Sequence, residues 1–118
     1  MPDSVKHIEE LGIIEVHSSI ILSTEDISSS INLINHISKE TGITKVLVNT
    51  LQVESMPNIN SILNLTKVFP RNVKIAVICS EEQPIYKDIL CIETAALYQG
   101  ISFRLFTSQT DAFQWLNR

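Results

Sequence analysis

Glycine is scarce in this sequence, and its residues do not cluster. The chain of 118 residues contains only Gly12, Gly42 and Gly100, each far from the others. Phosphate-binding loops and dinucleotide-binding fingerprints need several glycines within a few positions, because the backbone must approach the phosphate closely. The sequence therefore argues against nucleotide binding through either type of loop.

Cysteine is equally rare. Cys79 and Cys91 lie in apolar stretches, which read KIAVIC and DILCIETAAL. Two cysteines do not make a disulfide framework, and unpaired apolar cysteines are typical of a reducing compartment. We expect both thiols to be reduced and mostly buried.

Long apolar runs and a targeting signal are also missing. No apolar stretch approaches the ~20 residues that a membrane-spanning helix needs. The first residues, MPDSVKHIEELG, have neither the basic nor the apolar region of a signal peptide. We expect a protein with no transmembrane segment and a cytoplasmic location.

Basic residues are outnumbered by acidic ones. Nine Lys and Arg residues accompany 13 Asp and Glu residues, which gives a formal net charge of −4. This balance argues against general electrostatic binding to nucleic acid or to an anionic membrane. Hydrophobic residues make up 44% of the chain, which excludes a disordered protein. At this length we expect one domain over residues 1–118.

The sequence does contain a regular alternation of strand and helix patterns. Strand patterns cover 6–10, 13–19, 45–50, 72–79 and 101–106, and helix patterns cover 24–41, 57–69, 84–99 and 108–116. Strands that alternate with helices form right-handed crossovers and a parallel sheet. The pattern predicts an α/β fold with a mainly parallel sheet, an antiparallel N-terminal hairpin and four helices.

Caps and apolar periodicity define the predicted helices. Ser23 or Thr24 caps the first helix, Gly42 ends it, and Ser108 begins the last one. The third helix has a wide apolar face, which consists of Ile85, Ile89, Leu90, Ile92, Ala96 and Leu97. We expect that face to be buried.

The side chains that carry catalytic chemistry are scattered. His7, His17 and His36 fall on two strands and a helix, and no pair has the spacing of a zinc motif. Cys79 is followed by Glu81 and Glu82, which raise rather than lower the pKa of a thiol. The sequence predicts no enzyme, no metal site and no cofactor.

Three segments resemble the STAS family, named for sulfate transporters and anti-sigma-factor antagonists, in its small SpoIIAA-like form. They are LSTEDI after the first hairpin, KVLVNT followed by a capped helix, and the ending FRLFTSQTDAFQWL. The resemblance implies a non-catalytic regulatory or protein-interaction module with a possible protein partner. The related CRAL-TRIO lipid-transfer domains imply the alternative, a carrier or sensor of a small apolar, lipid-like ligand.

One segment departs from that family. Regulatory members carry Asp-Ser-Ser/Thr-Gly after the third strand, where a serine is phosphorylated, whereas residues 49–57 here read NTLQVESMP. Ser55 is the one residue near the acceptor position, and it has no preceding Asp and no following Gly. We expect no phosphorylation switch, and Ser55 or Asn58 caps the second helix.

The expected ligand or partner region is the edge where the parallel strands end, because ligands of open α/β sheets bind there. Its polar residues are Asn49, Thr50, Ser55, Ser80, Thr107 and Ser108. We expect Trp115 to lie at the surface beside Phe113. Together with the exposed first hairpin, it predicts a homodimer, since small chains cover such apolar patches with a second copy.

Overall fold

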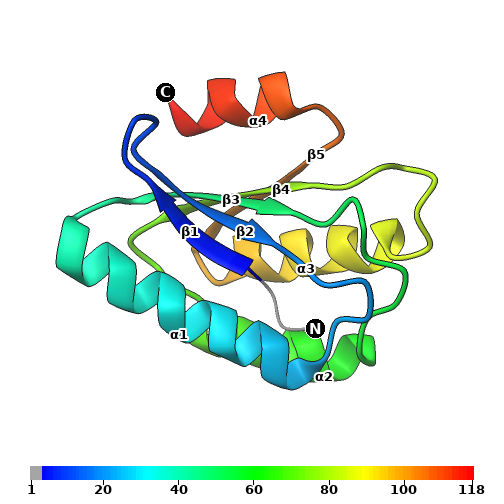
Figure 1. Cartoon of the computed structure of the whole chain (residues 1–118). Coiled ribbons are helices and arrows are strands. Elements are labelled where there is room, and N and C mark those ends of the chain that lie inside the picture. Colours follow the sequence, from blue (N-terminus) through cyan, green and yellow to red (C-terminus); the bar gives the residue numbers. More distant parts are fainter. Residues whose placement is uncertain (1–3) are drawn as a thin grey trace.

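The computed structural model describes residues 4–118 and contains one five-stranded sheet (Figure 1). The strands lie in sequence order and are β1 (Ser4–Ile8), β2 (Ile13–His17), β3 (Lys45–Asn49), β4 (Lys74–Ile78) and β5 (Ser102–Phe106). β1 pairs antiparallel with β2, and every other neighbouring pair is parallel. The predicted fold class is confirmed.

Helices cover the two faces of the sheet unequally (Figure 1). They are α1 (Thr24–Thr41), α2 (Ile59–Leu65), α3 (Tyr86–Tyr98) and α4 (Gln109–Leu116), with a short 3-10 turn, η1 (Thr66–Val68), after α2. α1, α2 and α3 lie on one face, here called the three-helix face. α4 alone lies on the other, here called the α4 face. No helix within residues 4–118 is long and apolar enough to cross a membrane.

Each face has its own hydrophobic core. The three-helix face packs Ile14, Val16, Val46, Ile75 and Val77 against apolar side chains of the three helices. The α4 face packs Ile13, Leu47, Ala76 and Ile78 against Ala112, Trp115 and Leu116. The apolar sequences of β3 and β4 follow from this arrangement, because both strands are covered on both faces.

In β2, buried apolar residues alternate with more exposed polar residues. In β2, Ile14 and Val16 are buried, whereas His17 is exposed and its Nε2 lies 2.6 Å from Glu15 Oε1. The predicted half-exposed hairpin strand is confirmed. The first strand lies at Ser4–Ile8, two residues before its predicted position, because Glu9 and Glu10 belong to the turn.

The helix caps follow the predicted chemistry. Ser23 Oγ accepts from the Asp26 amide at 3.1 Å, and Gly42 ends α1 with a φ of 76°. A left-handed backbone of this kind favours glycine. At α4 the Ser108 hydroxyl accepts from the Asp111 amide at 3.3 Å. At α2 the structure selects between the two predicted caps, because Asn58 Oδ1 accepts from the Asn60 amide at 2.8 Å. Ser55 as the cap is wrong.

One main-chain donor on the free edge of β5 is occupied by a side chain. The Leu105 amide donates to Glu93 Oε2 of α3 at 2.6 Å. In a sheet this amide would otherwise be open to a further strand.

Four predictions of exposure are wrong: three residues expected to be buried are exposed, and one expected at the surface is buried. Cys91 is exposed, and the α3 leucines Leu90 and Leu97 are 39% and 74% exposed, because no element within residues 4–118 covers that side of α3. Trp115 is not at the surface. It is 9% exposed and lies against Phe106, with ring centroids 5.8 Å apart.

Candidate functional site

The loops that follow three parallel strands enclose a groove of about 560 Å³. We call it the carboxyl-end groove, because it lies where β2, β3 and β4 end. It is lined by Ile20 after β2, by Leu51, Gln52, Val53 and Glu54 after β3, and by Ser80, Glu82, Gln83 and Pro84 after β4. This is the edge at which the sequence predicted a ligand or partner region.

Thr50 ties the end of β3 to the end of β4 beside the carboxyl-end groove. Its amide and its hydroxyl both donate to the Ile78 carbonyl oxygen, at 3.0 and 2.8 Å. Next to it, Asn49 Oδ1 accepts from the Leu51 amide at 2.9 Å, which turns the chain sharply after β3. These two predicted residues therefore shape the loop that presents Leu51.

Gln83 joins two walls of the groove. Its Nε2 donates to the carbonyl oxygens of Thr50 at 2.8 Å and Val53 at 3.1 Å, and its Oε1 accepts from the Ser80 amide at 2.8 Å. Sequence reasoning missed Gln83. Its two carbonyl partners lie 33 and 30 positions away along the chain, so the sequence around Gln83 does not reveal them.

The third wall comes from the segment after β2. The Leu22 amide donates to the Ser55 carbonyl oxygen at 3.0 Å, and the Glu54 amide donates to the Ile20 carbonyl oxygen at 2.8 Å. Ser55 thus acts through its main chain, by extending the parallel pairing beyond β2 and β3. The pairing holds Ile20 and its neighbour Ile21 outward, where they are 52% and 71% exposed.

The surface around the groove combines aliphatic and acidic side chains. Leu51 is 50% exposed and lies between the Ile20 and Gln83 walls. Glu54 and Glu82 line the groove, Glu81 is exposed beside them, and no Lys or Arg is among the described lining residues. The arrangement suits a partner with apolar and positively charged groups.

Two predicted residues stand apart. Thr107 and Ser108 follow β5 and do not line the groove, and Ser108 is engaged in capping α4. Of the six predicted residues, only Ser80 lines the groove. Asn49, Thr50 and Ser55 lie in or next to the segments that form its walls, whereas Thr107 and Ser108 lead into a helix on the α4 face.

Cys79 lies just behind Ser80 and is fully buried. Burial raises the pKa of its thiol, and a hydrogen bond with the Thr50 side chain partly opposes that rise. A neutral, inaccessible thiol is a poor nucleophile. Within residues 4–118, no group of three or more His, Cys, Asp and Glu side chains is placed to hold a metal ion.

A separate apolar cavity of about 120 Å³ lies between the three-helix face and the helices. Its walls come from the sheet side chains Val16, Val48, Ile75, Val77 and Phe103 and from apolar residues of α1, α2 and α3. Ser18, Ser30 and Thr50 contribute hydroxyl groups. The lining of this cavity is thus mostly apolar, and the cavity is distinct from the carboxyl-end groove.

The fold is similar to that of a solved structure. This is an uncharacterized protein from the DUF3478 family with a SpoIIAA-like fold from Shewanella loihica PV-4. The match has a TM-score of 0.58 and 19% sequence identity, and it covers 97% of this chain and 91% of that protein. The chain therefore has a SpoIIAA-like fold, as the sequence resemblance implied. No protein-family model and no curated protein matches it.

Proposed function

We propose that this protein is a non-catalytic interaction module that binds a protein partner at the carboxyl-end groove. The observation that carries the proposal is the exposure of Ile20, Ile21 and Leu51 on loops held by main-chain pairing and by Gln83. Exposed aliphatic side chains on an ordered surface are typical of binding sites, because such a patch is costly to leave in water.

The charge of the rim defines the partner. Glu54, Glu81 and Glu82 surround the aliphatic side chains without a Lys or Arg in the lining. Complementary charge favours association and excludes like-charged competitors. The partner segment carries an aliphatic side chain for the groove and Lys or Arg for the rim.

The non-catalytic part of the proposal is supported by the dispersal of reactive groups. Catalysis needs a nucleophile, a base and an orienting group in one pocket. His17 contacts Glu15 on the α4 face, and His36 lies 3.8 Å from Glu40 at the end of α1. The groove offers only carboxylates, amides and one serine hydroxyl.

A peptide selection tests the proposal. Random 12-residue peptides displayed on phage are selected against the immobilised protein, against Leu51→Glu and against Leu97→Glu. Leu97 is exposed on the uncovered side of α3, so its variant is the matched control. We expect enrichment of aliphatic residues with Lys or Arg, lost with Leu51→Glu and kept with Leu97→Glu. Peptides that bind all three proteins equally would contradict the assignment.

A second candidate function, a carrier or sensor of a small apolar ligand, is favoured by the apolar cavity. Its volume of about 120 Å³ is below the ~300–1,000 Å³ of ordinary ligand sites, but near the ~150 Å³ of an engineered cavity that binds benzene. The ligand would be a compact molecule rather than a long acyl chain. Methyl resonances of Val48 and Val77 that shift saturably with benzene would support this function, and unchanged resonances would refute it.

A homodimer in the cytoplasm belongs to the same proposal. The dimer was predicted from a surface Trp115 and from the exposed hairpin. Trp115 is buried, so only the hairpin, with β1 at the edge of the sheet, still supports the dimer. Light scattering at high protein concentration tests the dimer, and a monomer there would refute it.

A further inference from the structure

A second pocket, of about 380 Å³, lies at the opposite edge of the sheet, where the parallel strands begin. We call it the amino-end pocket. Lys45 begins β3, Lys74 begins β4 and Arg71 precedes β4, and all three line the pocket together with Arg118. Four of the nine Lys and Arg residues of an acidic chain thus surround one hollow.

Side-chain carboxylates do not neutralise these cations. The described lining of the amino-end pocket contains no Asp or Glu. Glu9 and Glu10 on the hairpin turn and Glu40 near the end of α1 are exposed outside that lining. Even if the main-chain oxygen of Arg118 is counted as a carboxylate, four positive charges accompany one negative charge.

Two of the four cations donate hydrogen bonds at the C-terminal end of α4. Lys45 Nζ donates to Asn117 Oδ1 at 2.9 Å, and Lys74 Nζ donates to the main-chain oxygens of Trp115 at 3.2 Å and Arg118 at 3.5 Å. The two lysines therefore complement the C-terminal end of α4, where positive charge is favourable.

Arg71 does the same for another helix. Its two terminal nitrogens donate to the main-chain oxygen of Gln99 at 2.6 Å and to Gln99 Oε1 at 3.4 Å, at the end of α3. A guanidinium has five donors and an ammonium has three, so N–H groups remain on each side chain. Stabilising helix ends explains part of the cluster and leaves donors for a ligand.

We propose that the amino-end pocket binds a phosphate group. Guanidinium N–H groups beside Lys ammonium groups form the donor set that phosphate oxygens prefer. A hollow lined by positive charge concentrates anions. The net charge of −4 by itself would repel anions from the protein. The volume lies within the range of small-molecule sites. This site is independent of the partner proposed for the carboxyl-end groove.

Titration with inorganic pyrophosphate tests the site. Amide resonances of Thr44, Asn72 and Ser102, which line the pocket, are followed by NMR at constant ionic strength. A parallel arm measures co-sedimentation with phosphatidylcholine vesicles, with and without phosphatidic acid, which separates a soluble phosphate ligand from a lipid headgroup.

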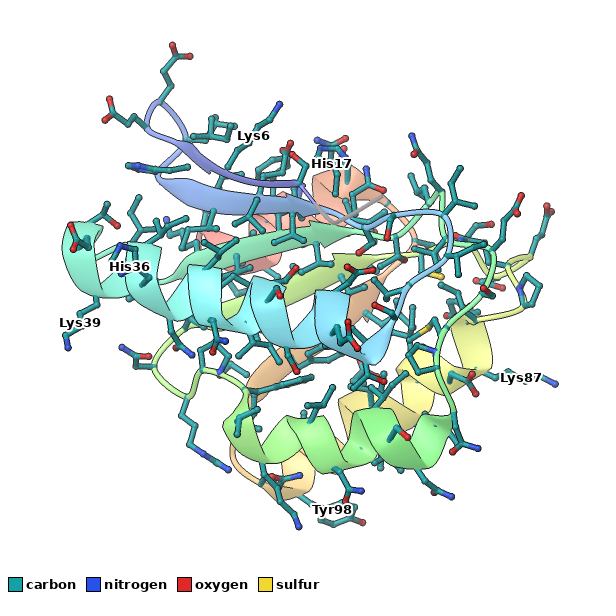
Figure 2. The ribbon with its side chains drawn as sticks, turned by 60° about the horizontal axis from the view of Figure 1, so that its bottom comes forward. Lys6, His17, His36, Lys39, Lys87 and Tyr98 are labelled. Carbon is teal, nitrogen blue, oxygen red and sulfur yellow. The ribbon has the colours of Figure 1, made fainter. Side chains whose placement is uncertain are left out.

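Matched variants remove one positive charge each. Arg71→Gln and Lys45→Gln alter the pocket, whereas Lys39→Gln and Lys87→Gln are controls outside it. Figure 2 shows Lys39 at the end of α1 and Lys87 at the opposite end of the molecule. Because charged hydrogen bonds are lost, we expect each pocket variant to weaken pyrophosphate binding about tenfold or more. The controls change binding less than twofold.

The outcomes are distinct. Saturable shifts that the pocket variants weaken support a soluble phosphate ligand. Sedimentation with phosphatidic acid alone, reduced by the same variants, supports a lipid phosphate. No saturable response in either arm, or equal losses in controls and pocket variants, overturns the proposal. Lys45→Gln keeps the test valid if Arg71→Gln fails to fold, because Lys45 donates to Asn117 after α4, whereas Arg71 donates to Gln99 at the end of α3.

Discussion

The side-chain amide of Gln83 donates to the Thr50 carbonyl oxygen at 2.8 Å, so the loop after β4 holds the loop after β3. Gln83→Leu removes this bond and those with Val53 and Ser80. We expect a loss of about 1–3 kcal/mol in the free energy of unfolding, since partly buried main-chain groups lose their partners. Gln52→Leu, on the same loops but exposed, is the control for urea denaturation. Equal effects of the two variants would contradict the assigned role.

The cap of α2 gives a second prediction. Asn58→Ala removes the side-chain oxygen that accepts from the Asn60 amide, and we expect a loss of about 0.5–2 kcal/mol. Ser55→Ala leaves the main-chain pairing with Leu22 intact and changes stability by less than about 0.5 kcal/mol. Thermal unfolding of both variants distinguishes them, and the reverse order would refute the cap.

The two thiols differ in accessibility. Cys91 is exposed and Cys79 is fully buried. A disulfide reagent at neutral pH should label one thiol rapidly in the native protein and the second only after unfolding. Cys91→Ser should abolish the rapid phase. Two rapid equivalents in the native protein would contradict the burial of Cys79.

The raised pKa of the Cys79 thiol predicts a loss of stability in alkali. An unfolded thiol ionises near pH 8.5, and the folded thiol does so at a higher pH. Below about pH 8.5 the thiol keeps its proton in both the folded and the unfolded state. Above it the unfolded state releases its proton first, so the free energy of unfolding falls until the pKa of the folded thiol is passed.

Cys79→Ala isolates this effect from other titrating groups. The alkaline decline of stability, measured by urea denaturation, should be shallower in Cys79→Ala than in the parent protein. Cys91→Ala should keep the slope of the parent. A slope that Cys79→Ala leaves unchanged would show that the thiol does not contribute.

The apolar cavity predicts opposite results for two valines of β3. Val48 lines the cavity, and Val48→Ile should raise stability by about 0.5–1 kcal/mol, because the added methyl group fills empty space. Val46 is fully buried in the core and does not line the cavity, so Val46→Ile should overpack it and cost about 1–3 kcal/mol. Stability loss in both variants would argue against an empty cavity.

The strands and caps could be predicted because their causes are local. KVLVN and KIAVI are apolar on both faces, and Ser23, Gly42 and Ser108 stand where helices begin or end. Exposure on α3 could not be predicted, because a helical period identifies an apolar face without showing how much of it a neighbour covers. Leu97 and Cys91 lie beyond the part that the sheet covers.

The groove and the pocket depend on long-range contacts. Ser80 and Thr50 were predicted from the rule that ligands bind where parallel strands end. Gln83 was not, since its carbonyl partners Thr50 and Val53 come from another loop. Lys45 and Arg71 are 26 positions apart in sequence, and only the order of the strands brings them to one hollow.

The carboxylate of Glu93 makes the two edges of the sheet unequal as sites for adding a further strand. The carboxylate accepts from the Leu105 amide, so a strand that pairs with β5 must first displace this hydrogen bond. On the opposite side, β1 ends the sheet next to β2 alone. If a further strand adds to this sheet, by a second copy or by an aggregating chain, we expect it at the N-terminal hairpin. An assembly that begins there is a pair of sheets joined edge to edge rather than an open-ended ribbon.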